Sequence, residues 1–278
     1  MTVKIVTDSA ADLTVEQADS LGVRIVPLTI RFGEEEFVDV IELTADQFYE
    51  KMAAEPTLPA TAAPSPGAFE EAIRAAGAEG DQVIVINISG DLSATVQSAE
   101  NAKRSIGDEI DVRVFDSKSI TATLGLKVIA AAEAAAAGKD ADEIITMLED
   151  LRSRSRVYGA LNTLDNLKKG GRIGGAQAML GSMLSIKPIV DISDGSVHEA
   201  AKVRTRKKAL VWLRDRVFAE PQLDTLALCS GNADDTEELL DLIAERYPRD
   251  KVQIWTIGPV IGAHGGPGVL GLAWHQPN

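Results

Sequence analysis

The chain has 278 residues, of which 45% are hydrophobic and 25% are charged, and its formal net charge is -14 at pH 7. This length allows one large or two medium-sized domains with buried cores, and no apolar run approaches the ~20 residues of a membrane-spanning helix. The negative charge disfavours a nucleic-acid-binding protein, because phosphate backbones require a basic surface.

The first residues alternate like a β-strand, and no basic stretch precedes an apolar segment with a small-residue cleavage site. We therefore expect no secretory signal and a cytoplasmic location. In the first half of the chain, apolar segments rich in Val and Ile alternate with helical patterns. Strands are predicted over residues 3–9, 24–32, 82–89 and 111–117. Helices are predicted over residues 11–22 and 93–106. Two further helices are predicted to begin at residues 44 and 140, and another to end at residue 138.

Helix starts are marked by capping residues. Thr44 with Gln47 fits a capping box, and Asp140 with Glu143 opens the last helix of this half. The continuous apolar strand over residues 82–89 is typical of a parallel sheet that is covered on both faces.

The sequence pattern changes at about residue 155. Strands are predicted over residues 156–162, 187–193, 195–203, 225–231 and 251–258, and helices over 205–219 and 234–247. A turn at Asp194 and Gly195 predicts an antiparallel pair. We therefore expect an α/β protein of two α/β domains. Residues 1–155 would form a mainly parallel sheet flanked by helices, and residues 156–278 a mixed sheet with helices.

Two kinds of site are disfavoured. Gly266, Gly268 and Gly271 satisfy G-x-G-x-x-G, but only seven residues follow them, too few for the helix and second strand of a dinucleotide site. A zinc site is not expected, because the histidines are unclustered and the single cysteine, Cys229, lies in an apolar run typical of a buried structural thiol. The histidines are His198, His264 and His275.

Hydroxyl side chains stand at several predicted strand ends and loops. Ser65 precedes Pro66 and is expected to cap a helix, whereas Thr61 lies in a proline-bounded loop where turn bonding and ligand binding are both open. Ser93 lies where a strand ends and a helix begins, and it either caps the helix or binds an anion there. Asp8 and Asp12 occupy a similar strand-to-helix junction, where we favour capping over metal binding or acid/base chemistry.

Basic residues are concentrated in two segments. A solvated surface is the ordinary interpretation, and binding of a phosphate or an acidic partner is the functional one. The cluster comprises Lys168, Lys169, Arg172, Lys202, Arg204, Arg206, Lys207 and Lys208.

Taken in order, the motifs of this chain resemble those of the DegV family. Members of that family bind a fatty acid and serve in bacteria as the acyl-carrying subunit of fatty acid kinase. The resemblance runs along essentially the whole chain. It rests on the strings IVTDSAADL, TAAPSPGAF, ISGDLSATVQSA, VFDSKSI, LDNLKKGGRIGG, MLGSMLSIKPIV, KVRTRKKA and IGPVIGAHGGPG.

The resemblance implies two α/β domains with a lipid tunnel between or beside them. It also implies that Thr61, Ser93 and His264 hold the fatty acid carboxylate. This sequence departs from the family pattern at Ala62–Ala63 and Ala94–Val96, which affects the expected contacts to the head group.

The resulting expectation is a non-catalytic carrier. It would bind a long-chain fatty acid such as palmitate and present its carboxylate to a partner kinase, which makes an acyl phosphate that feeds phospholipid synthesis. No metal or cofactor is expected in this chain. The basic cluster motivates a further expectation, that Arg172 and Arg204 contact the phosphate or the kinase.

The sequence leaves two other functions open. A serine hydrolase would use Ser93 or Ser65 as the nucleophile and His264 as the base, although no G-x-S-x-G motif occurs. A binder of a small phosphorylated metabolite would use the glycine-rich segment and the basic cluster.

Overall fold

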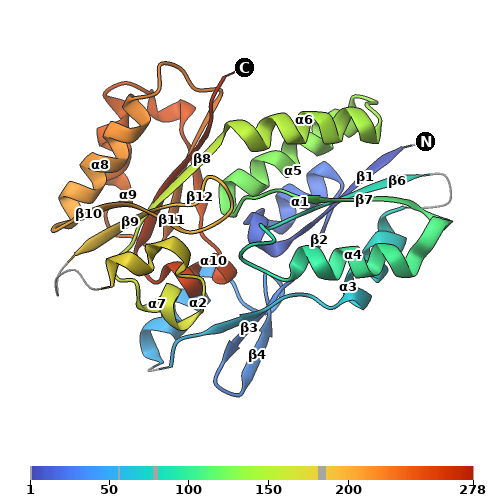
Figure 1. Ribbon diagram of the computed structural model, residues 1–278, viewed down its shortest axis with the longest axis horizontal. Coiled ribbons are helices and arrows are strands. Elements are labelled where there is room, and N and C mark those ends of the chain that lie inside the picture. The colour runs from blue at the N-terminus through green and yellow to red at the C-terminus, as the bar shows by residue number, and fades with distance from the viewer. Residues whose placement is uncertain (1, 56, 78–80, 181–185, 278) are drawn as a thin grey trace.

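The computed structural model describes residues 2–55, 57–77, 81–180 and 186–277, whose strands form three sheets (Figure 1). The first sheet is parallel throughout, as expected, with the order β2-β1-β6-β7. Its strands are β1 (Val3–Asp8), β2 (Val23–Val26), β6 (Gln82–Asn87) and β7 (Asp111–Asp116).

Helices cover both faces of this sheet because successive residues of each strand point to opposite sides. In β1, Val6 packs with Phe69 of α3 and Ala99 of α4, whereas Ile5 joins the core on the opposite face, where Ala131 of α5 lies. The helices are α1 (Val15–Leu21), α3 (Pro66–Ala76), α4 (Thr95–Ile106), α5 (Thr121–Ala136) and α6 (Ala141–Arg154).

The second sheet is mixed, with the order β10-β9-β8-β13-β11-β12 and with β11 and β12 as its parallel pair. Its strands are β8 (Ser155–Ala160), β9 (Lys187–Asp191), β10 (His198–Val203), β11 (Thr225–Gly231), β12 (Gln253–Thr256) and β13 (Val269–His275). Helices α8 (Arg206–Phe218) and α9 (Thr236–Ala244) pack on one face. The other face, with Val157 and Ala273, joins the core that also contains Ile5. The α/β fold class is confirmed; a domain division at residue 155 stays a prediction.

A small antiparallel sheet, β4-β3-β5, differs from the sequence prediction. The single strand expected over residues 24–32 is two strands on either side of Pro27, and they belong to different sheets. Thr61, expected in a loop, lies in a three-residue strand opposite Ile30. The strands are β3 (Thr29–Phe32), β4 (Glu35–Val38) and β5 (Ala60–Ala62), and α2 (Ala45–Ala54) follows β4.

The glycine-rich end of the chain is also more regular than expected. His264 lies in a short helix, α10 (Pro259–Gly265), which begins with proline at its first turn. The strand that follows, β13, was not predicted, yet it lies between β8 and β11 in the sheet. Gly266 and Gly268 adopt positive φ angles between helix and strand, so these glycines form a turn rather than a dinucleotide fingerprint.

Most local predictions of helix starts and turns are confirmed. Thr44 and Asp140 form capping boxes, Ser65 accepts from the N–H of Ala68, and Asp8 caps a short 3-10 helix at Ser9–Ala11. Strands β9 and β10 form the expected antiparallel pair. Each described helix is too short or too polar to cross a membrane.

Polar contacts join the N-terminal half (residues 2–154) to the C-terminal half (155–277). Ser89 Oγ donates to the carbonyl of Gly195 at 2.7 Å, and Tyr49 donates to the carbonyl of Ile257 at 3.0 Å. The two halves are therefore bonded to each other at more than one point.

Candidate functional site: an apolar cavity with a polar entrance

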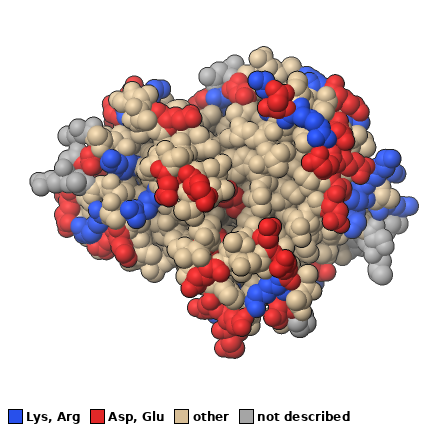
Figure 2. All heavy atoms as spheres, turned by 180° about the vertical axis from the view of Figure 1, so that it is seen from behind, with Lys and Arg blue, Asp and Glu red and all other residues tan. Residues whose placement is uncertain are grey.

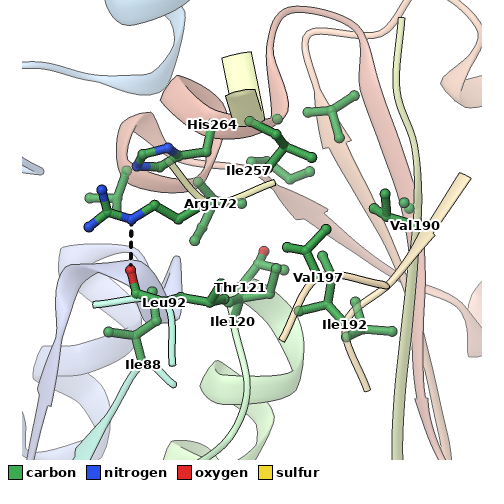
Figure 3. A pocket seen from close by; sticks show the side chains of 18 of the residues that line it. Ile88, Leu92, Ile120, Thr121, Arg172, Val190, Ile192, Val197, Ile257 and His264 are labelled. Atoms are coloured by element: carbon green, nitrogen blue, oxygen red, sulfur yellow. Dashed lines mark hydrogen bonds between the residues drawn. The ribbon is translucent and has the colours of Figure 1, made fainter. Parts of the chain in front are cut away.

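A cavity of about 160 Å³ lies where the two halves meet, and both halves contribute to its wall (Figure 3). Most of the lining side chains are aliphatic; examples are Leu28, Ile88, Ile120, Val190, Ile192 and Val197. An apolar cavity with a few polar groups at one place is the usual form of a site for a small amphipathic ligand.

Thr61 and His264 form the central polar pair. Thr61 comes from β5 and His264 from the last turn of α10, and Oγ1 and Nε2 lie 2.9 Å apart. Which of the two donates depends on the histidine tautomer. Burial, with a smaller effect from the charge of Arg172, lowers the pKa of His264 from 6.5 to about 4. The ring is therefore neutral at pH 7 and has one N–H to donate.

Backbone packing fixes the position of the His264 ring. A Cβ atom on Gly170 would lie 2.3 Å from Nδ1, so only glycine leaves room for the ring there. Asn166 donates to the carbonyl of Ala263 at 3.0 Å and thereby ties α7 (Asp165–Lys169) to α10. No pattern in the sequence identifies Gly170 or Asn166, because their role depends on two helices that are distant in the chain.

Arg172 lies beside this pair. Its Nε donates to the carbonyl of Leu92 at 2.9 Å and its Nη1 to the carbonyl of Gly170 at 2.7 Å. It lines both the apolar cavity and a more polar hollow of about 460 Å³ at the entrance, together with Thr61, Lys169 and His264. A negatively charged group at this entrance would meet two cationic side chains.

Ser93 also lines the cavity, in the loop between β6 and α4. Its Oγ lies 2.7 Å from Oγ1 of Thr95 and accepts weakly from the Thr95 N–H at 3.3 Å. The N-cap position of α4 is Ala94, which has no side-chain cap. The start of this loop is fixed by the buried side chain of Asp8, which accepts a hydrogen bond from the N–H of Ile88 at 2.8 Å, directly after β6.

The remaining predicted site residue, Arg204, lies elsewhere. It is exposed between β10 and α8 and is not among the residues that line the cavity or its entrance. Its neighbour Arg206 forms a two-pronged ion pair with Asp235. The basic cluster of the sequence is thus split in space, with Lys169 and Arg172 at the entrance.

The departures from the family pattern fall in two environments. Ala63 and Ala94 line the cavity, whereas Ala62 is exposed. Small apolar side chains here leave fewer polar contacts next to Thr61 and Ser93.

The described residues do not support the alternative chemistries. His264 pairs with Thr61, while Ser93 pairs with Thr95 and Ser65 caps α3, so no serine–histidine pair is formed. No group of three or more potential metal ligands is found in the described part of the chain. Cys229 is buried in the cavity wall, and burial raises its thiol pKa to about 12, as expected for an unreactive thiol.

On the face opposite to that of Figure 1, acidic side chains, interspersed with basic ones, lie mostly around the rim, and the area between them is largely uncharged (Figure 2). This surface agrees with the net charge of -14 and offers no basic track for a nucleic acid on this face.

Comparison with known proteins gives similarity over the full chain. The DegV domain-containing protein of Halalkalibacterium halodurans is 37% identical over 280 residues, which cover 98% of each chain. A solved structure of a DegV family protein from Thermus thermophilus, reported for its fatty acid binding, has a TM-score of 0.91 to this chain and is 33% identical to it. The alignment covers all of both chains. A stearic acid-binding protein from Eubacterium ventriosum has a TM-score of 0.87 and 28% identity, covering 99% of this chain and 98% of its own.

A family model described as "Uncharacterised protein, DegV family" matches residues 2–276. The fold, the full-length relatives and this match agree with the motifs noted in the sequence. The chain belongs to the DegV family.

Proposed function

We propose that this protein binds a long-chain fatty acid in the apolar cavity and presents its carboxylate, at the Thr61–His264 pair, to a partner kinase. The observation that carries the proposal is this pair, 2.9 Å apart, at the border between an aliphatic cavity and a polar entrance. The fatty acids bound by the similar DegV structures are consistent with it.

The two ends of such a ligand contribute differently to binding. Burial of about fifteen methylenes, at roughly 0.8 kcal/mol each, is worth ~12 kcal/mol before the costs of ordering. Each hydrogen bond to the carboxylate contributes about 1.5 to 3 kcal/mol. The cavity therefore supplies most of the affinity, while Thr61, Ser93 and His264 determine where the carboxylate lies.

This division suits a carrier rather than an enzyme. The kinase would supply ATP, metal and catalysis, and the acyl phosphate would remain bound here. The added phosphate would be close to Arg172 and Lys169 at the entrance, and their positive charge would stabilise it. The exposed Arg204 would contact the kinase.

Native mass spectrometry of freshly purified protein tests the first part. We expect a co-purified mass equal to a fatty acid, which disappears after delipidation and returns on addition of palmitate or stearate. An empty protein that does not take up either acid would contradict the proposal.

The kinase step is tested separately with a fatty acid kinase catalytic subunit and ATP. Loaded protein should support formation of acyl phosphate, and Arg172→Ala and Arg204→Ala should each reduce turnover while palmitate still binds. If both variants bind lipid and turn over like the unmodified protein, the roles of these arginines are wrong.

A further inference from the structure

A second polar position in the cavity wall is not used by the proposed function. Thr121 is the first residue of α5, is only 2% exposed and lines the cavity, but its Oγ1 has no hydrogen-bond partner among the described residues. Its φ of 42° is in the left-handed region, where a β-branched residue is a genuine outlier. A buried, unpaired hydroxyl on a strained backbone is costly, and such positions concentrate where a ligand is bound.

Asp12 stands next to Thr121 and is likewise unsatisfied. Its Oδ2 is buried without a hydrogen bond of good geometry in the described part of the chain, and the Thr121 hydroxyl lies close enough to lower the pKa of Asp12, and that of Cys229, by weak hydrogen bonding. On the other side of the carboxyl, a Cβ on Gly258 would lie 2.6 Å from Oδ1, so the group is held tightly. Burial raises the pKa of Asp12 well above its usual value, which favours the protonated carboxyl, a form that can both donate and accept.

The position is separate from the entrance. Figure 3 shows Thr121 beside Ile120, with Val197 and Ile257 around it and apart from the His264 ring. A second carboxylate or a phosphate would not suit this position, because the cationic side chain among the described lining residues, Arg172, lies at the entrance beside the neutral ring of His264. A neutral oxygen that can both donate and accept fits the Thr121 hydroxyl, which lines the cavity, while Asp12 is not among the lining residues and acts through Thr121.

We propose that Thr121, supported by Asp12, forms a second polar subsite in the wall of the acyl cavity, which accepts the hydroxyl group of a hydroxylated fatty acid. This inference rests on the proposed binding of fatty acids. A water molecule has the same hydrogen-bonding chemistry and is the competing occupant, with a plain acyl chain packed over it.

The test compares stearate with hydroxystearates whose hydroxyl lies near the carboxyl, in the middle of the chain or near the methyl end. Delipidated protein is titrated with each acid. At least one hydroxystearate should bind as tightly as stearate or more tightly. Thr121→Val, which keeps the shape and removes the hydroxyl, should weaken that acid about tenfold and leave stearate unchanged or tighter. Thr121→Ser, which retains a hydroxyl, should keep the preference.

Two results would overturn the inference. One is that every hydroxystearate binds the unmodified protein more weakly than stearate. That result would mean that Thr121 binds a water molecule rather than a hydroxyl group of the ligand. The other is that Thr121→Val changes both acids by the same factor. If Thr121→Val does not fold, Thr121→Ala provides the same comparison. Failure of stearate itself to bind would instead contradict the proposed function, so the two failures are distinguishable.

Discussion

Thr61 and His264 are separated by 203 positions in the chain, yet their side chains share a hydrogen bond of 2.9 Å. The bond forms only when β5 of the N-terminal half and α10 of the C-terminal half are both in place. Each residue has an ordinary alternative role when the sequence is considered alone, a turn hydroxyl and a buried histidine. Their contact indicates a shared role, because the two side chains together border the apolar cavity.

Removal of the Thr61 hydroxyl should weaken fatty acid binding. Thr61→Val keeps the β-branched shape that suits a strand and deletes one hydrogen bond to a carboxylate, worth about 1.5 to 3 kcal/mol. The dissociation constant for palmitate, measured by displacement of a fluorescent fatty acid, should rise about ten- to hundredfold.

Ser65→Ala is the matched control. Ser65 is exposed and caps α3, so its loss should lower stability by about 1 kcal/mol without changing palmitate affinity. Equal affinity losses in Thr61→Val and Ser65→Ala would contradict a specific role for Thr61.

His264 should remain neutral well below its ordinary pKa. Burial, and to a lesser degree Arg172, lowers the pKa to about 4 from 6.5. The stability that depends on the neutral ring is therefore fully present above pH 6.5 and is lost as the pH falls towards 4. In an NMR titration of ligand-free protein, the imidazole signal that is missing from His264→Gln should have its midpoint near pH 4. A midpoint near 6.5 would show that the ring is solvated.

At the scale of elements, α7 and α10 position the histidine by close packing at Gly170. This residue has φ of -72°, which alanine adopts without strain, so an added methyl acts only by steric contact with the ring at 2.3 Å. Gly170→Ala should displace His264 from Thr61 and weaken palmitate binding about tenfold, as measured by calorimetry.

Gly67→Ala in α3 is the comparison for that variant. A Cβ there has an ordinary contact at 3.8 Å, and alanine should stabilise the helix by about 0.5 to 1 kcal/mol. If Gly170→Ala binds palmitate as Gly67→Ala does, close packing at Gly170 does not position the histidine.

Elements with strong local signals could be predicted from the sequence. Strand β6 is a continuous apolar run, and the capping residues Thr44 and Asp140 mark their helices directly. Strand β5 has three residues and depends on pairing with β3, so it has no sufficient local pattern. Strand β13 is an apolar run, but the glycines before and within it are typical of a loop and mask the strand signal.

The same reasoning applies to the site. Thr61, Ser93 and Arg172 were expected to contribute, and the structure brings them to the cavity with His264. Thr121 could not be identified, because a buried hydroxyl without a partner is a property of the tertiary packing, and its backbone conformation has no signature in the letters around it.

At the scale of the whole molecule, one core cluster contains residues of both halves, Ile5 and Ile84 from the first and Val157 and Ala273 from the second. The apolar cavity lies within this common core rather than in a groove on either half. Bound ligand should therefore stabilise both halves together, by about 2.7 kcal/mol when its free concentration is one hundred times the dissociation constant.

The bonds that join the halves bear on how a bound fatty acid would leave. Ser89 with Gly195 and Arg172 with Leu92 hold the cavity walls together, so we expect the lipid to leave when these walls part. If the chain slid out along its length instead, each methylene would slow release about fourfold, from ~0.8 kcal/mol apiece. We expect palmitate and stearate to dissociate at nearly the same rate in a stopped-flow exchange experiment, and Ser89→Ala to accelerate both equally. The rate at which the protein opens, rather than the length of the bound acyl chain, would then determine how fast the fatty acid is released.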